Sequence, residues 1–289
     1  MDTIYAKTAR FDDARALTED EMRKTAPSIF TIDAHESRSD KFSPIPTIEV
    51  LRALANEQFF PVGVQQVASR LPGHELHTKH LIRMRRFDDK VYQVGDNVFE
   101  LLLKNANDGS SIYDLMGGMF RIRCMNSMVT HSSTVDEVKV RHSGDAIYNV
   151  IEGTYRVLES ADRVLEAPVK WGAIPLDEPE RIAFAAKAHA LRFGEGEKMS
   201  PMAGSVSSLQ LLEPQRDGDR GHDLWTVFNV VQENAMKGGL EGLGTDRTGR
   251  QRLYRTRPVK GIDQTVGLNR ALWKLADETA AAERALATA

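Results

Sequence analysis

The sequence predicts an α+β fold, with an antiparallel sheet in the N-terminal half packed against helices and a helical C-terminal half. Two observations lead to this prediction. Apolar residues alternate with other residues in short runs across residues 59–142, which is typical of strands. From residue 144 onward, apolar residues recur with helical spacing. Strands gathered in one half and helices in the other favour α+β over a doubly wound fold.

Residues 46–289 are expected to form one α+β domain, preceded by an N-terminal extension over residues 1–45. Within the domain, the strand-rich part covers residues 59–142 and the helix-rich part covers residues 144–289. The chain has 289 residues, of which 41% are hydrophobic and 27% are charged, a composition typical of globular proteins. That length is sufficient to bury a substantial core.

Local signals place three helices in the N-terminal half. Thr18 and Glu21 have the spacing of a capping box, which predicts a short helix within the extension. Residues 46–47 precede apolar residues at helical spacing and predict the start of a second helix. An Asn-Asp-Gly turn at residues 107–109 predicts a third, short helix, which begins near Ser110 and interrupts the strands.

The helix-rich part shows clear starts and stops. Gly238 directly follows an apolar stripe and predicts the end of a helix there, because glycine readily adopts the conformation that terminates helices. Residues 240–261 are rich in glycine and arginine and are expected to form a loop. The predicted helical regions cover residues 144–168, 179–193, 224–237 and 263–286.

The chain is expected to be a cytoplasmic protein that does not enter a membrane. Its single cysteine, Cys124, excludes intramolecular disulfides and cysteine-cluster metal sites, and it lies in an apolar alternation typical of a core residue. No apolar run approaches the roughly 20 residues that span a bilayer. The N-terminal residues lack the basic and apolar segments of a signal peptide. We therefore expect the reducing cytosol.

The formal net charge of −3 argues against a uniformly basic protein, but it conceals a strongly basic segment at residues 245–260. Six cations stand there against one acid, Asp246, and Tyr254 offers an aromatic face on which a nucleobase could stack. The alternative is a solvated loop whose charges pair with acidic helices. The cations are Arg247, Arg250, Arg252, Arg255, Arg257 and Lys260.

Three candidate strands each carry two cations on one face, because side chains alternate across a strand. Like charges directly opposite one another destabilise a sheet. Neighbouring strands of this kind would therefore favour an anionic partner such as a polyphosphate backbone. Alternatively, the strands are not adjacent, or acids such as Glu100, Asp136 and Glu137 neutralise them. The three pairs are Arg83 with Arg85, Arg121 with Arg123, and Lys139 with Arg141.

One short pattern is compatible with a metal-dependent nuclease. Glu137 and Lys139 have the acid-x-lysine spacing that nucleases of the restriction-endonuclease type place on one strand. Asp108 or Asp114 could supply the second acid. A metal-bound water needs at least two converging carboxylates, and convergence depends on the fold. This nuclease is therefore an alternative function, while no metal site is assigned.

Three histidines recur at a spacing of three residues. On a strand, residues three apart face opposite sides, and on a helix they drift around the surface. The spacing of His74, His77 and His80 therefore favours surface or phosphate-contacting roles over a metal site. No cofactor and no catalytic residue are assigned from the sequence.

Short motifs spread over nearly the whole chain, from about residue 20 to residue 280, stand in a characteristic order. They are APSIF (26–30), HESRS (35–39), PIPT (44–47), NDGSS (107–111), GGMFR (117–121), CMN (124–126), LWT (224–226), QEN (232–234), GGL (238–240), TR (256–257), GID (261–263) and LNRALW (268–273). Together they resemble the phage- and plasmid-borne family named domain of unknown function 932. The resemblance implies residence on mobile elements or their remnants, for which DNA is the expected class of ligand.

The predicted architecture is also analogous to that of the single-strand annealing proteins of recombination. Those proteins use a small core of sheet and helices, assemble into rings and bind single strands along a basic groove. Because a fold does not by itself define a function, this analogy supplies a hypothesis only. We expect a homo-oligomeric, mobile-element DNA-binding protein that prefers single strands and binds or anneals them.

In this hypothesis the cations of the three strand pairs follow the phosphates of the DNA. The basic segment at residues 245–260 closes over the strand, and Tyr254 stacks on a base. Besides the nuclease, a third function class fits the same charges. A protein-binding antagonist of host defence would use these charged surfaces to engage another protein, without nucleic acid.

Overall fold

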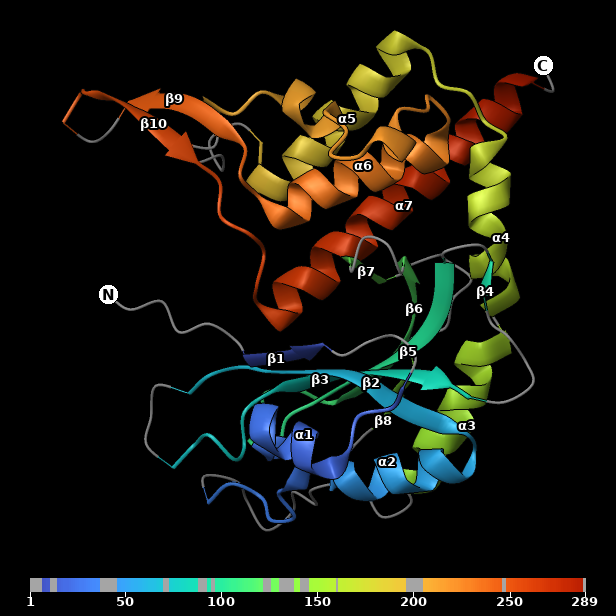
Figure 1. Ribbon diagram of the computed structural model, residues 1–289, viewed down its shortest axis with the longest axis vertical. Coiled ribbons are helices and arrows are strands. Elements are labelled where there is room, and N and C mark those ends of the chain that lie inside the picture. Colours follow the sequence, from blue (N-terminus) through green and yellow to red (C-terminus); the bar gives the residue numbers. More distant parts are fainter. Residues whose placement is uncertain are drawn as a thin grey trace. The chain divides into compact units, whose positions relative to one another are not determined.

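A computed structural model describes most of the chain and confirms the α+β prediction (Figure 1). The chain divides into two compact units. The first consists of Met1–Leu165 and Lys260–Ile262, and the second of Glu166–Val259 and Asp263–Ala289. The predicted extension and the predicted single domain over residues 46–289 stay predictions. The described residues are 7–10, 15–36, 46–69, 73–87, 93–94, 97–121, 126–129, 138–140, 146–159, 161–195, 205–245 and 248–287.

Within the described residues, an eight-stranded antiparallel sheet forms the centre of the first unit. Its main path runs in the order β1-β2-β3-β5-β6-β7, while β4 pairs with β5 and β8 pairs with β6. The strand-rich prediction for residues 59–142 is therefore confirmed in outline. The strands are β1 (Lys7–Arg10), β2 (Phe59–Gln66), β3 (His80–Arg86), β4 (Gln93–Val94), β5 (Asn97–Asn105), β6 (Tyr113–Arg121), β7 (Asn126–Val129) and β8 (Val138–Val140).

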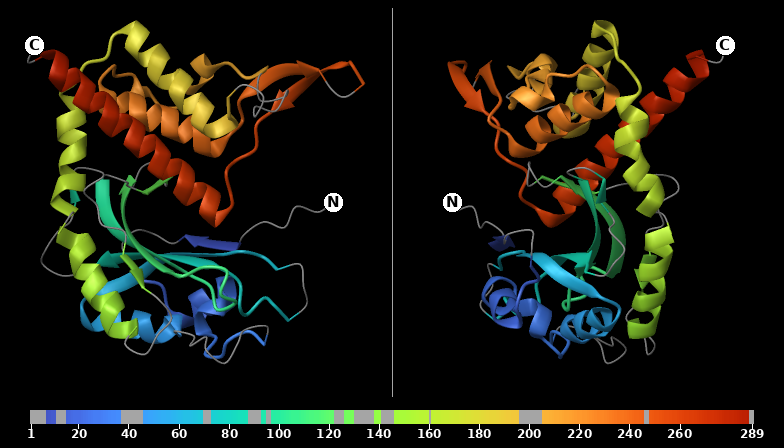
Figure 2. Two further views of the ribbon diagram at one scale, coloured as in Figure 1. Left: turned by 180° about the vertical axis from the view of Figure 1, so that it is seen from behind. Right: turned by 45° about the vertical axis from the view of Figure 1, so that its right-hand side comes forward.

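One face of the sheet forms a hydrophobic core with the N-terminal helices. In the register of β3 and β5, Ile82 lies opposite Leu103 and Met84 opposite Leu101, and all four side chains are buried. Two helices, α1 and α2, cover this face (Figure 2). The alternation read from the sequence therefore marks one core face, although residues on the opposite face, such as Glu100 and Leu102, are buried as well. The helical elements of this unit are α1 (Glu19–Thr25), η1 (Pro27–Phe30), α2 (Thr47–Asn56) and α3 (Ala146–Glu159).

The starts of α1 and α2 are confirmed as predicted. The hydroxyl of Thr18 accepts from the backbone N–H of Glu21, and the carboxylate of Glu21 accepts from the backbone N–H of Thr18. This reciprocal pair is the predicted capping box, which satisfies two N–H groups that the helix leaves unpaired. Pro46 is the N-cap of α2, where its fixed backbone angle suits the entry to a helix.

The helix predicted to begin near Ser110 is wrong, because the chain enters strand β6 instead. Asp108 accepts a hydrogen bond from the backbone N–H of Ser110 at 2.8 Å, and Gly109 adopts a positive φ of 70°. A side chain that bonds to the backbone two residues later closes a turn as readily as it caps a helix. Here the turn joins β5 to β6, which pair over most of their length.

The second unit is mainly helical. The predicted helices at residues 179–193, 224–237 and 263–286 are confirmed, and Gly238 ends the second of them with a positive φ of 68°. The apolar stripe at residues 144–168 proves to contain two helices, α3 and α4, rather than one. The remaining elements are α4 (Ala161–Gly172), which begins in the first unit, α5 (Glu178–Phe193), η5 (Ser208–Leu212), η6 (Asp217–Asp219), α6 (Leu224–Lys237), β9 (Glu241–Thr245), β10 (Gln251–Arg255) and α7 (Ile262–Ala287).

An aromatic cluster forms part of the core of the second unit. The ring centroids of Trp171 and Trp273 lie 4.6 Å apart, and Phe228 stands nearly perpendicular to Trp273 at 5.6 Å. Trp225 completes the cluster at 5.9 Å from Phe228. Aromatic pairs in such geometries add stability beyond the apolar area that they bury. All three tryptophans of the chain belong to this cluster.

No helix in the described part of the chain is both long and apolar enough to cross a lipid bilayer.

Candidate nucleic-acid interface

The segment predicted as a loop, residues 240–261, contains a two-stranded antiparallel hairpin. Strands β9 and β10 pair from Glu241 opposite Arg255 to Thr245 opposite Gln251. We call residues 241–255 the arm, and Figure 1 shows that it extends away from the helices of the second unit. The loop prediction is wrong because the glycines of β9 hide the alternation that usually marks a strand.

The base of the arm is held by a dense set of backbone contacts. The backbone N–H of Thr256 donates to Leu240 at 2.8 Å, and Gly239 donates to Thr256 at 2.9 Å. The hydroxyl of Thr256 also accepts from Leu240 at 3.0 Å. A Cβ atom at Gly238 would lie only 2.7 Å from the carbonyl carbon of Arg257. The close approach therefore requires glycine at this position.

A partly buried arginine adds a second attachment at the base of the arm. The guanidinium of Arg192 donates to the carbonyl of Ala235 and to the carbonyl of Arg257, each at 3.0 Å. Burial lowers the pKa of Arg192, and a smaller electrostatic interaction with Tyr254 opposes this change. The cation satisfies a carbonyl in the last turn of α6, where positive charge is favoured. It thereby ties α6 to the chain that leaves the arm.

The arm and the residue pair that follows it present several arginines to solvent. Among the described residues of the arm, Glu241 is the exposed acidic residue. Its carboxylate lies 3.6 Å from Arg255 Nε. Because both side chains are largely exposed, water screens this pair and the attraction is weak. The local surface is therefore cationic. The exposed arginines are Arg250, Arg252, Arg255 and Arg257.

The two faces of the arm differ. Tyr254 and Arg252 lie opposite Gly242 and Gly244 in the register, so these four residues share one face. A Cβ atom at Gly242 would lie 2.4 Å from the backbone oxygen of Ser205, so this face packs against the body of the unit. Tyr254 is accordingly half-buried. Only part of its ring is available for the stacking that the sequence predicts.

The structure places the remaining residues of the predicted basic segment differently. Lys260 is exposed but belongs to the first unit. Arg247 lies outside the described residues, and so do Arg123 and Arg141 from the strand pairs. Arg121 is the last residue of β6, opposite Asn97 in the register. The arm therefore brings together Arg250, Arg252, Tyr254 and Arg255, with Arg257 just beyond its base.

In the sheet, the strand of Arg83 and Arg85 is not adjacent to that of Arg121, because β5 lies between β3 and β6. Glu100 on β5 receives both arginines, with N–O distances of 2.6 Å to Arg83 and 2.7 Å to Arg85. The carboxylate is 3% exposed and each guanidinium side chain 11% exposed. The geometry thus matches the alternative in which Glu100 neutralises this pair.

A second acidic residue, Asp114, lies between two lysines on neighbouring strands of the sheet. Lys104 Nζ lies 3.0 Å from the carboxylate of Asp114, and Lys139 on β8 stands opposite Asp114 in the register. Each acid therefore lies between two cations, so like charges do not face one another directly. This arrangement stabilises cross-strand pairing without an external anion. Lys139 is nevertheless exposed at the sheet edge.

The structure describes only part of the predicted nuclease pattern. Glu137 lies outside the described residues, and Asp114 is occupied by Lys104. Asp108 accepts from the turn backbone. Within the described ranges, no group of three or more His, Cys, Asp or Glu side chains is arranged to hold a metal ion.

Sequence reasoning missed a buried polar network beneath the sheet. The hydroxyl of Ser28 donates to Gln66 at 2.8 Å and therefore accepts from Nδ1–H of His80, also at 2.8 Å. This leaves His80 Nε2 to accept from the hydroxyl of Thr47 at 2.9 Å. Asn105 donates to the same hydroxyl at 3.1 Å. His80 is fully buried, so the expected surface role is wrong for this histidine.

The other two histidines of the run meet a third that is distant in sequence. The rings of His35 and His74 lie 4.0 Å apart, and those of His35 and His77 lie 5.1 Å apart. Burial, together with the neighbouring His35, lowers the pKa of His77, while Asp108 acts weakly in the opposite direction. These packed rings join the N-terminal segment to the loop before β3. Their proximity depends on the fold and leaves no local signal in the sequence.

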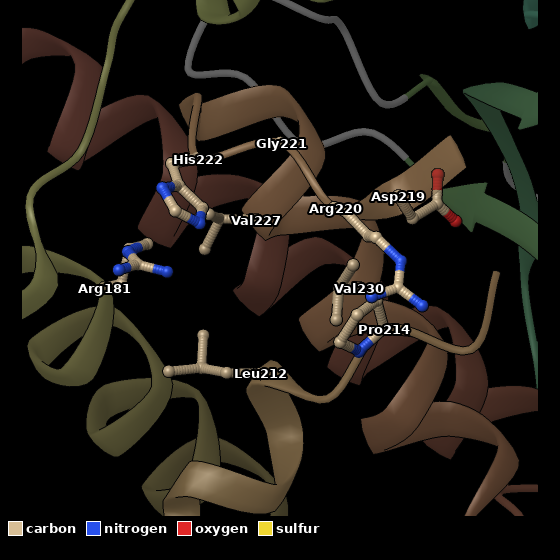
Figure 3. A pocket seen from close by; sticks show the side chains of 9 residues that line it. All are labelled: Arg181, Leu212, Pro214, Asp219, Arg220, Gly221, His222, Val227 and Val230. Carbon is tan, nitrogen blue, oxygen red and sulfur yellow. The ribbon is translucent and has the colours of Figure 1, made fainter. Parts of the chain in front are cut away.

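A small cavity of about 250 Å³ opens between α5, α6 and the segment around η6 (Figure 3). Arg181 and His222 lie at one side of it, and the apolar side chains of Leu212, Val227 and Val230 line its wall. Typical ligand pockets have about 300–1,000 Å³. Because this cavity is smaller, the candidate interface is placed on the arm.

Fold and site together define an α+β protein that carries a cationic hairpin arm on a helical unit. Residues 34–273 match the family model described as domain of unknown function (DUF932), and the chain belongs to this family. It is similar to the UPF0380 proteins YafZ and YfjQ of Escherichia coli (strain K12). Each is 41% identical over 263 residues, which cover 91% of this chain and 91% of the relative. No solved structure matches the chain significantly.

Proposed function

We propose that this protein binds nucleic acid through the arm, prefers single-stranded DNA, and acts on the DNA of mobile elements without a catalytic residue of its own. The observation that carries the proposal is the arginine-rich arm. Residues 250–257 hold four exposed arginines, two of them on β10 and one on each side of that strand along the chain. Few ligands other than a polyanion offer several negative charges along a line of this length.

The arm suits a flexible single strand. A strand with unstacked bases can bring phosphates to the arginines along the β10 side of the hairpin, and its bases can reach apolar side chains. Its attachment through Thr256 and Arg192 holds the arginines in place before binding. Ordering of the arm therefore adds little to the cost of association.

The sheet takes a smaller part in this proposal. Arg83 and Arg85 are held by Glu100, so we assign them to the stability of the sheet rather than to phosphate contacts. Lys139 and Lys260 are exposed but belong to the first unit, so the proposal assigns them no contact with a strand bound on the arm. Annealing of complementary strands is the finer form of the proposal, because cationic surfaces reduce the repulsion between two backbones.

The test is a fluorescence-polarisation titration with a labelled oligothymidine at several salt concentrations. We expect binding that weakens steeply with salt, because each neutralised phosphate releases counterions. The double variant Arg250→Gln/Arg252→Gln should bind more weakly. Its slope of log affinity against log salt should fall by about 0.7 for each lost contact.

The matched control is Lys187→Gln/Lys274→Gln, which removes the same charge from exposed positions on α5 and α7. This control should retain the affinity and the slope of the natural protein. Equal losses in both variants, or no binding of the natural protein at low salt, would overturn the proposal. Oligonucleotide cleavage in the presence of Mg²⁺ or Mn²⁺ would overturn its non-catalytic part.

The finer claim of annealing needs a separate measurement. Two complementary oligonucleotides that carry a donor and an acceptor dye should anneal faster with the protein than without it, under salt conditions that allow binding. The Arg250→Gln/Arg252→Gln variant should lose this acceleration. A protein that binds both strands without increasing the annealing rate would contradict the finer claim only.

A further inference from the structure

The outer face of the arm carries two leucines that point away from the body of the unit. Leu243 and Leu253 lie directly opposite each other in the register, which places them on one face. Their exposed fractions are 68% and 65%. An exposed apolar pair on an extending hairpin buries little of its own surface within the chain, so folding alone gains little from it.

The charged neighbours of this pair define what could cover it. Arg255 and Glu241 form the next cross-strand pair on the same face, toward the base of the arm. Arg250 and Arg252 are also exposed; Arg252 precedes Leu253 directly on β10, although it belongs to the opposite face of the hairpin. A partner that contacts both the leucines and these arginines offers apolar surface next to negative charge. Single-stranded nucleic acid has this combination, with flat bases on a phosphate backbone.

The inner face is less suitable for this purpose. Tyr254, the aromatic residue of the arm, is on the side that packs near Ser205 and interacts electrostatically with Arg192. The open apolar surface of the arm therefore belongs to the leucine pair rather than to Tyr254.

We propose that Leu243 and Leu253 form a platform for the unstacked bases of a single strand whose phosphates lie along the arginines of the arm. This inference rests on the proposed function and specifies it further. It explains a preference for single strands, since paired bases in a duplex are stacked on one another and do not expose their faces. It also predicts tolerance of sequence, because every base has an apolar face.

The test compares an oligothymidine with an abasic oligonucleotide of equal length, which keeps the phosphates but lacks the bases. The variant Leu243→Thr/Leu253→Thr removes the apolar platform while threonine preserves strand propensity. The natural protein should bind oligothymidine more tightly than the abasic strand. The variant should lose on the order of tenfold in affinity for oligothymidine and retain its affinity for the abasic strand.

The outcomes separate the platform from the proposed function. Binding of neither oligonucleotide by the natural protein would overturn both. Equal binding of both strands, or a variant that retains its affinity for oligothymidine, would overturn the platform alone. Sedimentation analysis of the natural protein and of the variant, both without DNA, tests whether the leucines instead contact a second copy of the chain. A natural protein that self-associates through the leucines, and a variant that does not, would assign the pair to a second copy of this chain and overturn the platform.

Folding of the variant is checked with the tryptophans, because all three belong to the aromatic core of the second unit. Their emission maximum should not change in Leu243→Thr/Leu253→Thr. A second pair, Leu243→Met/Leu253→Met, keeps the apolar character and should keep the affinity for oligothymidine. Loss of affinity in the methionine pair, with unchanged emission, would contradict a platform based on apolar contact.

Discussion

Glu100 accepts two hydrogen bonds from Arg83, at 2.6 Å from Nε and 2.8 Å from Nη2. Arg85 donates to the same carboxylate at 2.7 Å. Burial raises the pKa of Glu100, but Arg83 and then Arg85 outweigh it, so the pKa stays below its usual range. The carboxylate is therefore charged at neutral pH and links β3 to β5. A pattern that suggested a phosphate site in the sequence is thus a structural ion cluster.

Replacement of Glu100 by glutamine should destabilise the protein strongly. Two arginines with little exposure would lose their counter-charge, and breaking a buried ion pair in this way costs about 3–5 kcal/mol. Denaturant unfolding followed by far-UV circular dichroism measures the change. Glu152→Gln is the matched control, because Glu152 pairs with Arg156 at an exposed position of α3. Unchanged unfolding of Glu100→Gln would contradict the structural role of the cluster.

Acid should destabilise the first unit through His80. Burial lowers the pKa of His80 to about 4, against about 6.5 in an unfolded chain. Between these values the unfolded state binds more protons than the folded state, so stability is complete above about pH 6.5 and falls as pH decreases. At about pH 4, the free energy of unfolding has fallen by about 3 kcal/mol through this residue, because each pH unit between the two pKa values costs about 1.4 kcal/mol.

The variant His80→Gln isolates this effect, because glutamine cannot take up the proton. Free energies of unfolding measured by urea titration between pH 4 and pH 7 should show a flatter curve for the variant than for the natural protein. The difference between the two curves removes the contributions of other titrating groups, such as His77. Parallel curves would show that His80 does not titrate as its burial requires.

The sequence predicts those elements whose signal is local. The capping box at Thr18 and Glu21, the start of α2 after Pro46 and the end of α6 at Gly238 depend on neighbouring residues, and all three are confirmed. The turn at Asp108 is also local, but the same side-chain bond closes a hairpin or caps a helix. Only the pairing of β6 with β5 decides between them, and the side-chain bond itself does not specify that pairing.

The site depends on contacts that a pattern cannot contain. Glu100 neutralises Arg83 only because the strand order places β5 beside β3. The sequence predicts a loop in place of the arm because Gly242 and Gly244 carry no side chains that could show the alternation of a strand. Its form depends on the approach of Ser205 to Gly242, across residues far apart along the chain. Charge composition alone indicates the segment of the proposed interface, but only the strand register shows which residues lie on each face of the arm.

The approach of Ser205 to Gly242 makes a sharp prediction. A Cβ atom in Gly242→Ala would lie 2.4 Å from a backbone oxygen, so the arm must shift from its position. We expect a loss of about 1–3 kcal/mol in stability and weaker binding of oligothymidine. Gly267→Ala is the control, since nothing lies within 4 Å of the added atom. Equal behaviour of the two variants would show that the contact with Ser205 does not position the arm.

Arg192 provides the final test of how the arm is held. Its two hydrogen bonds join the carbonyl of Ala235 in α6 to that of Arg257 beyond the arm. In Arg192→Met the apolar stem remains but both carbonyls lose a charged donor, which should cost about 1–3 kcal/mol. Oligothymidine binding should weaken, although Arg192 is only partly exposed and is assigned no contact with DNA. Because the tryptophan cluster is separate from these bonds, tryptophan emission should remain native. A shifted emission maximum would instead mean that the helical core depends on Arg192. Unchanged binding of oligothymidine would mean that Arg192 does not hold the arm in position.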